Sequence, residues 1–141
     1  MTTPEHTLPP RYLAWLAALP GDHLVRFKKR RWEFCSLEEL DQPLRVNKTK
    51  ATFATQLSAF VVMYRTLGAT AAVGPRETDF GFDRLIRSIV LAEANDELLF
   101  VDPGDNFSVW NLVPEDLTVS KVASDIFTFI EGATVEDLTD D

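Results

Sequence analysis

The sequence predicts an α+β fold in which an antiparallel β-sheet is flanked by helices in a single domain. Apolar residues recur at intervals of three and four near the start and in the middle of the chain, as in amphipathic helices. Three apolar runs between residues 85 and 113 are separated by turn residues and indicate consecutive antiparallel strands. With 141 residues, of which 45% are hydrophobic, the chain can bury a sizeable core without disulfides or metals. We expect one domain over residues 1–141, with flexible tails at 1–7 and 134–141.

Residues 9–19 form the first predicted helix. Pro9 and Pro10 suit its first turn, where a missing N–H costs nothing, and Pro20 and Gly21 end it. Its apolar stripe consists of Tyr12, Leu13, Trp15, Leu16 and Leu19.

A hairpin and a short helix are predicted next. Residues 23–27 and 32–34 have the pattern of paired strands, and the basic residues 28–31 form the turn between them. Ser36 and Glu39 then make a capping box, in which each side chain can satisfy an otherwise unpaired backbone N–H. The sequence therefore predicts a helix that begins directly after Ser36.

The longest predicted helix covers residues 50–67, and Gly68 is expected at its C-terminal cap. Residues 69–83 show little periodicity and predict a loop that packs two Phe side chains onto the core. The apolar face of the helix consists of Phe53, Leu57, Phe60, Val61, Tyr64 and Leu67.

The centre of the sheet is predicted from three strands at residues 85–92, 97–102 and 107–113. Asn95-Asp96 and the Pro-Gly-Asp-Asn sequence at 103–106 supply the two turns between them.

The last predicted element is a short apolar helix at residues 125–131, which follows a polar link. Ser124 is the expected N-cap of this helix, since its hydroxyl can accept a hydrogen bond from the first turn.

Charge is distributed unevenly along the chain, whose net charge is −8. Residues 1–50 carry a net charge of +3, whereas residues 51–141 carry −11. A negative body repels phosphate backbones, so we expect no nucleic-acid partner. The basic run at 28–31 has two interpretations, a solvated turn or a contact for an acidic or phosphorylated partner.

The N-terminus lacks the basic and apolar segments of a signal peptide, and the longest apolar run is far shorter than the roughly 20 residues of a membrane span. We expect a cytoplasmic protein with no membrane contact. The single cysteine, Cys35, cannot form an internal disulfide and is expected to be a small buried hydrophobe.

No catalytic pattern stands out in the sequence. The two histidines, His6 and His23, are too few for a typical metal site, and a nucleophilic pair of Cys35 with His23 lacks a third orienting group. Residues 102–106 have oxygen ligands but not the spacing of a calcium loop, so they predict a turn. The sequence therefore predicts no enzyme, no metal and no cofactor.

Two pairs of adjacent carboxylates occur in the sequence, and such pairs can perform acid–base chemistry. Glu38 with Glu39, and Glu115 with Asp116, lack the basic or apolar surroundings that would split their pKa values. They are interpreted as solvated surface.

Four segments together resemble the SUKH superfamily, which includes fungal cell-wall-synthesis regulators and bacterial immunity proteins. The opening residues 8–16 resemble the family's first helix, and residues 32–40 resemble its strand followed by Ser-Leu-Glu-Glu-Leu. Residues 97–113 are similar to its central hairpin, and residues 122–130 to its closing Phe-containing helix. The resemblance implies a SUKH-like single domain that acts by binding rather than catalysis.

For a bacterial member the resemblance implies an immunity protein that binds and neutralises a cognate toxin. An acidic surface suits a toxin with a cationic cleft, such as a nuclease, since opposite fields speed encounter. The alternatives are a regulatory or scaffold module with a cellular partner, and a small-molecule or nucleotide-binding enzyme. The acidic residues expected to contact the partner are Asp79, Asp83, Glu93, Asp96, Asp102, Asp105, Glu115 and Asp116.

Overall fold

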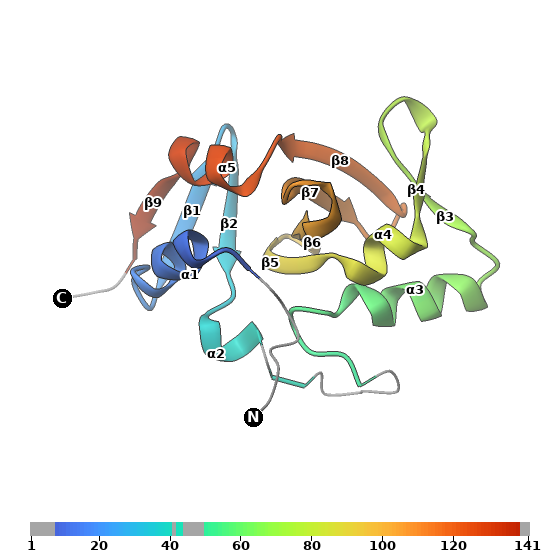
Figure 1. Cartoon of the computed structure of the whole chain (residues 1–141), viewed down its shortest axis with the longest axis horizontal. Helices are drawn as coiled ribbons and strands as arrows, with labels where there is room; N and C mark the ends of the chain where they lie inside the picture. Colours follow the sequence, from blue (N-terminus) through green and yellow to red (C-terminus); the bar gives the residue numbers. More distant parts are fainter. Residues whose placement is uncertain (1–7, 41, 44–49, 139–141) are drawn as a thin grey trace.

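The computed structural model describes residues 8–40, 42–43 and 50–138, and within them one nine-stranded sheet is packed with five α-helices (Figure 1). The strand order is β4-β3-β8-β7-β6-β5-β2-β1-β9. All neighbouring strands are antiparallel except β3 and β8. The predicted α+β class is therefore confirmed.

The strands and helices have the following bounds in the structure. The strands are β1 (His23–Phe27), β2 (Arg30–Phe34), β3 (Ala71–Val73), β4 (Asp79–Gly81), β5 (Ile89–Ala94), β6 (Glu97–Asp102), β7 (Ser108–Val113), β8 (Thr118–Ala123) and β9 (Thr134–Asp137). The α-helices are α1 (Pro10–Ala17), α2 (Leu37–Leu40), α3 (Leu57–Thr66), α4 (Phe82–Arg87) and α5 (Ile126–Gly132). Two 3₁₀ turns, η1 (Pro75–Glu77) and η2 (Pro103–Asp105), complete the order.

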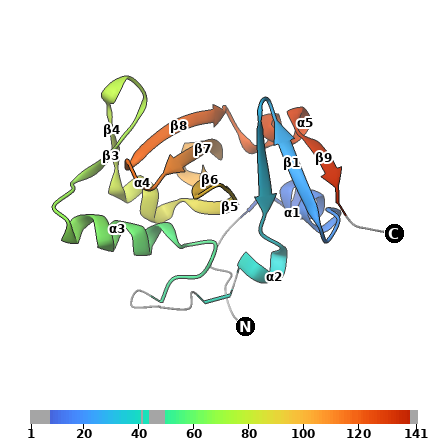
Figure 2. The ribbon, with the colours of Figure 1, turned by 180° about the vertical axis from the view of Figure 1, so that it is seen from behind.

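Helices cover both faces of the sheet, as the two opposite views in Figures 1 and 2 show. Side chains alternate across a strand, so Leu99 and Val101 of β6 join the core under α1 and α5. Leu98 and Phe100 join a second core under α3 and α4. We call these two sides of the sheet the α5 face and the α4 face. Burial on both faces explains why Leu98–Val101 of β6 are all apolar rather than alternating with polar residues.

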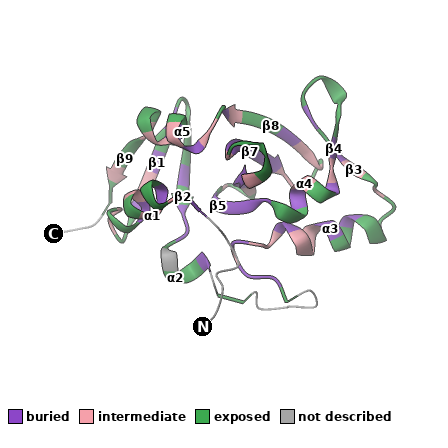
Figure 3. Ribbon diagram, in the orientation of Figure 1, coloured by how far each residue is buried: buried purple, intermediate pink, exposed green. Residues whose placement is uncertain are grey.

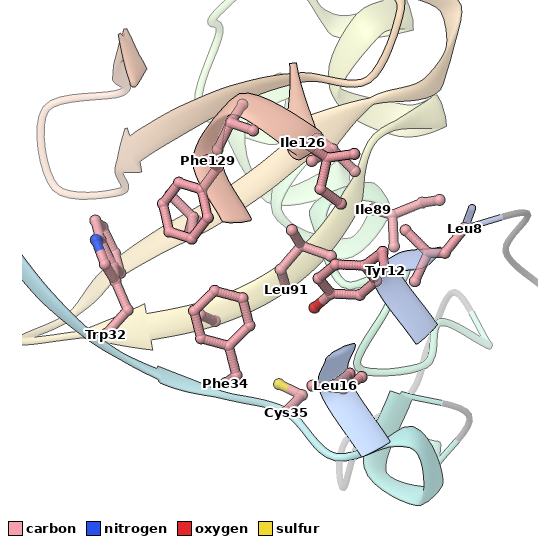
Figure 4. Close-up of a cluster of buried hydrophobic side chains, with 14 of the residues drawn as sticks. Leu8, Tyr12, Leu16, Trp32, Phe34, Cys35, Ile89, Leu91, Ile126 and Phe129 are labelled. Atoms are coloured by element: carbon pink, nitrogen blue, oxygen red, sulfur yellow. The ribbon is translucent and has the colours of Figure 1, made fainter. Parts of the chain in front are cut away.

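The core on the α5 face is rich in aromatic rings. Figure 4 shows Tyr12 of α1 and Phe129 of α5 on either side of Phe34 from β2. The ring centroids of Phe34 lie 6.5 Å from Tyr12 and 5.9 Å from Phe129. Offset and tilted ring pairs at these distances add to the energy gained from burial. The predicted amphipathic first helix is confirmed by this packing.

Buried residues run along the central strands, whereas the exposed positions gather on the helices, the turns and the outer strands (Figure 3). The turn between β5 and β6 is formed by Asn95 and Asp96 with φ angles of 48° and 67°. Two consecutive left-handed residues are what a two-residue hairpin turn requires. The predicted Asn95-Asp96 turn is confirmed.

The predicted capping box is present. Ser36 N–H donates to Glu39 Oε1 at 3.0 Å, and Glu39 N–H donates to Ser36 Oγ at 3.2 Å. Gly68, which follows α3 with a φ of 92°, is the predicted glycine in the left-handed conformation at a helix end.

The predicted helix over residues 50–67 is wrong in its first part, because α3 begins at Leu57. The backbone N–H of Thr52 donates to the Thr55 hydroxyl at 2.8 Å, which replaces a helical turn. The segment is held by tertiary hydrogen bonds as well: Ala54 N–H donates to Leu40 O at 3.0 Å, and Val90 N–H donates to Ala54 O at 2.8 Å.

The predicted loop over residues 69–83 is also wrong. It contains the β3–β4 hairpin, and β3 joins the main sheet through one parallel pairing of Val73 with Thr118. The helix α4 follows immediately, so the strand predicted at 85–92 begins only at Ile89. Strands of three residues are too short to produce a recognisable alternation.

Two further strands were missed. The predicted polar link contains β8, which pairs with β7 over its whole length. The predicted flexible tail at 134–141 contains β9, which pairs with β1. Residues 1–7 and 139–141 of the predicted tails lie outside the described residues. Both strands are short and mix polar with apolar residues, so their sequences lack the apolar runs of β5 and β6.

The N-cap of α5 is Asp125 rather than the predicted Ser124. The Asp125 carboxylate accepts a hydrogen bond from Thr128 N–H at 2.7 Å. This bond is the main cause of the lowered pKa of Asp125.

Because α5 contacts β1 closely at Gly132, a side chain at this position should destabilise the protein. A Cβ added to Gly132 would lie 2.9 Å from Cε1 of Phe27, whose ring stacks on Phe129 with a centroid distance of 4.5 Å. We expect Gly132→Ala to lower the free energy of unfolding by about 1–2 kcal/mol, since overpacking outweighs the gain in helix propensity. The matched control is Gly21→Ala, where the Cβ meets no atom within 4 Å. Equal urea midpoints for the two variants would contradict the prediction.

Candidate protein-binding surface

The eight acidic residues predicted to contact a partner do not form one surface. Successive turns between antiparallel strands lie at opposite ends of the sheet. The β5–β6 and β7–β8 turns therefore share one end, and the β6–β7 turn lies at the other. Glu93, Asp96, Glu115 and Asp116 are at or near the first end. Asp102 and Asp105 are at the second.

Asp102 is the one carboxylate of the eight that is fully buried. It accepts hydrogen bonds from Arg87 Nε at 2.7 Å, Arg84 Nε at 2.9 Å and Gly104 N–H at 3.0 Å. A second bond from Arg87, through Nη2 at 2.9 Å, makes that pair bidentate. Asp102 therefore anchors α4 and η2 to the end of β6, and its predicted contact with a partner is wrong.

Burial of Asp102 tends to raise the pKa of its carboxyl, because the charged form loses hydration. The hydrogen bonds from Arg87, Arg84 and Gly104 favour the charged form and outweigh that cost. The pKa of Asp102 is held below its ordinary value as a result. A buried charge is tolerated here because each oxygen has a cationic donor.

Asp105 and Asp83 are exposed but lie beside the same cations. Asp105 accepts from Arg84 Nη2 at 3.3 Å and from the Ser108 hydroxyl at 2.8 Å. Arg84 also covers the ring of Phe80, at 4.2 Å from its centroid. This end of the sheet is a mixed ion-pair network rather than a negative surface, so it is a weak candidate for binding a cationic partner.

Asp79, Glu115 and Asp116 are exposed near the β4 edge of the sheet. Asp79 lies opposite Val73, and Val73 pairs in turn with Thr118 just after the β7–β8 turn. These carboxylates are spread along an edge of the sheet.

Glu33 and Glu93 form the most unusual acidic feature. They lie directly opposite one another in the antiparallel pair of β2 and β5, and both are exposed. Side chains at opposite positions have Cβ atoms only about 4.5–5.5 Å apart, and like charges there are destabilising. No hydrogen bond or ion pair to either carboxylate is found among the described residues.

The two carboxylates line a surface hollow of about 440 Å³ on the α4 face, formed by residues of β1, β2, β5 and the β5–β6 turn. We call it the acidic hollow. Asp96 on the β5–β6 turn and Arg31 complete its wall. Arg31 forms an ion pair with Glu136, with Nε 3.1 Å from Oε1. The residues that line it are Leu24, Arg31, Glu33, Glu93, Ala94, Asn95 and Asp96.

Two of the predicted contact residues, Glu93 and Asp96, are thus brought together in the acidic hollow. Glu33 was missed, although it belongs to a predicted strand. Its significance depends on the register of β2 against β5, and these strands are separated by more than fifty residues of chain. The alternation of Trp32, Glu33 and Phe34 predicts only that Glu33 points away from the core.

The basic run at residues 28–31 occupies the tip of the β1–β2 hairpin. Arg30 Nη2 pairs with Glu97 Oε2 at 2.9 Å, and its guanidinium lies 5.2 Å from the centroid of the Trp32 ring. Lys28 has a φ of 57° in the turn and is exposed. The run therefore combines a solvated turn with cations that are already paired.

The residues considered for nucleophilic chemistry have structural roles. His23 Nε2 accepts a hydrogen bond from Phe34 N–H at 3.2 Å, which leaves Nδ1 to donate to Pro20 O at 2.8 Å. Cys35 is buried, as predicted. Burial, together with the charges of Glu39, Glu93 and Glu33, raises the pKa of its thiol to about 12.

In the described part of the chain, no three His, Cys, Asp or Glu side chains gather in a way that could hold a metal ion. None of the described helices has the length and apolar character needed to cross a bilayer.

The Asp102 network predicts a pH-dependent loss of stability. We expect Asp102→Asn to lower the free energy of unfolding at pH 7 by about 2 kcal/mol, because charge-assisted hydrogen bonds are lost. The pKa of Asp102 is lower in the folded protein than in the unfolded chain. Its carboxylate therefore adds to the free energy of unfolding above the unfolded pKa of ~3.9, and this contribution disappears as the pH falls through the folded-state pKa. Urea titrations at pH 7 and pH 3 should show the difference between the two proteins shrinking at pH 3. Asp105→Asn is the control, with a loss under about 1 kcal/mol.

The Cys35 thiol should be inert in the folded protein. With a pKa of about 12, its thiolate fraction at pH 8 is on the order of a thousandfold below that of an ordinary thiol. Alkylation by iodoacetamide should be slower by that factor in buffer and ordinary in urea. Rapid alkylation of the native protein would show that the thiol is more accessible than the structure allows.

Comparison with protein-family models, with curated proteins and with solved structures finds no match for this chain. The resemblance to the SUKH superfamily therefore stays a prediction.

Proposed function

We propose that this chain is an immunity protein of the SUKH type, which binds a cognate toxin one to one in the cytoplasm through the acidic hollow. The observation that carries the proposal is the Glu33–Glu93 pair. Two like charges placed opposite one another in a sheet reduce stability, and a cation from a partner would remove that repulsion on binding.

The chemistry of the hollow favours an arginine of the partner. A guanidinium presents several N–H donors in one plane and can bind two carboxylates at once. Asp96 on the rim of the hollow would extend the contact to a second cation. Leu24, which also lines the hollow, offers a small apolar contact.

The charge of the whole chain supports the same partner. A net charge of −8 attracts a cationic toxin over distances up to about the Debye length and raises the association rate at low salt. Covering a cationic cleft would also exclude an anionic substrate. Neutralisation by this route needs no catalytic group on the chain.

The proposal is tested by expressing the protein encoded beside this gene, alone and with the chain. Toxicity that the chain suppresses through a one-to-one complex, with an association rate that falls as salt rises, would support it. A stable complex with a cellular protein and no toxic neighbour would instead favour the regulatory or scaffold function.

Substitution of Glu33 distinguishes a binding role of the Glu33–Glu93 pair from a structural role. We expect Glu33→Gln to raise the free energy of unfolding by about 0.5 kcal/mol at low salt, because it removes a like-charge contact. The gain should disappear near 1 M salt, where the contact is screened. The same variant should bind the toxin about tenfold more weakly, as expected for one lost charge-assisted contact.

The matched control is Glu77→Gln, which makes the same charge change in the exposed β3–β4 loop. It should leave the free energy of unfolding close to that of the wild type and the Kd for the toxin within about twofold of the wild-type value. If Glu33→Gln destabilised the chain or left toxin affinity unchanged, the acidic hollow would not be the binding site.

A further inference from the structure

The acidic hollow adjoins a second hollow at the tip of the β1–β2 hairpin, with a volume of about 470 Å³. The two hollows share Arg31, Ala94 and Asn95. We call the second one the basic hollow, because basic residues form most of its lining: Arg26, Lys28, Lys29, Arg30 and Arg31. Surfaces of opposite charge therefore lie side by side, although the chain as a whole has a net charge of −8.

Two like charges face one another in the basic hollow, as they do in the acidic hollow. Arg26 of β1 lies directly opposite Arg31 of β2, and both side chains are exposed. We call them the basic pair, and we call Glu33 and Glu93 the acidic pair. Arg31 forms an ion pair with Glu136, whereas no ion pair of Arg26 is found among the described residues. Because like charges at opposite positions reduce stability, Arg26 is the cation that a carboxylate from outside would stabilise.

Both pairs lie on the α4 face of the sheet. Trp32 belongs to the core on the α5 face, so its neighbours Arg31 and Glu33 point to the opposite face. Arg26 and Glu93 lie on the same face as the residues that they oppose. The two pairs are two residues apart along β2, which is roughly 6–7 Å. A positive and a negative pair are therefore neighbours on one exposed surface.

A surface with adjacent pairs of opposite charge is complementary to itself. In a dimer with two-fold symmetry, the same patch of both copies forms the interface, and every contact occurs twice. When the two-fold axis runs between the pairs, across the strands and parallel to the face, the acidic pair of each copy meets the basic pair of the other. Such a dimer relieves both repulsions at once, whereas a purely cationic partner relieves only that of the acidic pair.

The net charge of −8 does not prevent this contact at physiological salt. The centres of two touching copies are roughly 30 Å apart, about twice the radius of gyration expected for this chain length. Repulsion over that distance is screened, because the Debye length at 0.15 M salt is about 8 Å. A carboxylate and a guanidinium in contact lie well within one Debye length, so their attraction remains.

We propose that a second copy of this chain occupies the acidic hollow when no toxin is bound, with Arg26 of each copy placed between Glu33 and Glu93 of the other. The dimer follows from the charged pairs alone, and only its competition with the toxin rests on the proposed function. The apolar residues that line the two hollows are Leu24 and Ala94. Because so little apolar surface is available, we expect a weak dimer with a Kd on the order of 100 µM.

Sedimentation equilibrium of the full chain tests the proposal, at concentrations from about 10 µM to about 1 mM in about 0.15 M salt. We expect a reversible equilibrium between monomer and dimer. The dimer Kd should rise about fivefold or more near 1 M salt, where the Debye length falls to about 3 Å and the contacts between the pairs are screened.

Two charge reversals provide the sharpest test. Arg26→Glu and Glu33→Arg should each raise the dimer Kd more than about tenfold, because each puts like charges in contact twice in the symmetric complex. Both variants should stay folded, since each replaces a like-charge pair within the chain by an ion pair. An equimolar mixture of the two should dimerise again, because the mixed complex has opposite charges at both contacts.

Arg76→Glu is the matched control. It makes the same charge change as Arg26→Glu, in the exposed β3–β4 loop. The strands β3 and β4 lie at one end of the strand order and β1 lies near the other, so the dimer Kd should stay within about twofold of the wild-type value. Equal loss of the dimer in both variants would show that net charge alone controls association, and would overturn the proposal.

Three further results would overturn the dimer. The first is a wild-type chain that is monomeric at about 1 mM. The second is a mixture of Arg26→Glu with Glu33→Arg that stays monomeric. The third is a dimer that Arg26→Glu leaves intact, since the copies would then meet through another surface.

The product of the neighbouring gene separates this inference from the proposed function. Arg26 does not line the acidic hollow, so Arg26→Glu should bind that protein at least as tightly as the wild type does. Adding the same protein to the wild type should replace the dimer by a one-to-one complex, and a toxin-bound dimer would overturn the competition. A wild-type dimer without toxin binding would contradict the proposed function alone. Toxin binding by a wild type that never dimerises would contradict the dimer alone.

Discussion

The constraint on which the rest of the structure depends is the burial of the central strands on both faces. Leu98 to Val101 of β6 are all buried, so each side of the sheet needs its own cover. The chain supplies α1 and α5 for one face and α3 and α4 for the other. Asp102 then fixes α4 at the end of β6 through two arginines. Among the described residues of the acidic half, Asp102 is the one buried carboxylate, and it serves the fold rather than a partner.

The acidic hollow lies where this cover stops. Among the described residues, the core under α3 and α4 contains no residue of β1 or β2. The surface of these strands and of the end of β5 on the α4 face forms the hollow where Glu33 and Glu93 meet. The acidic hollow contains a feature that a purely structural role does not explain, the like-charge pair of Glu33 and Glu93. Stability given up locally in this way is typical of functional sites.

The sequence predicted the elements with strong local signals. The capping box at Ser36, the strand 97–102 and the Asn95-Asp96 turn depend on neighbours within a few residues, and the structure contains them all. The failures share a cause, since β3, β4, β8 and β9 are short or mix polar with apolar residues and exist through pairing with distant strands. The same holds for the site. Glu93 and Asp96 could be chosen as exposed acids, but the position of Glu33 opposite Glu93 could not.

By itself the sequence determined the α+β class, the acidic second half and the absence of a recognisable catalytic pattern, because composition and local periodicity are properties of the chain. Only the tertiary structure decided which charges remain available. It buried Asp102 between arginines, paired Arg30 and Arg31 with Glu97 and Glu136, and left Glu33 and Glu93 facing one another. The physical reason is that the environment of a charge depends on strand register and on packing between residues far apart in the chain, and neither is contained in a local pattern.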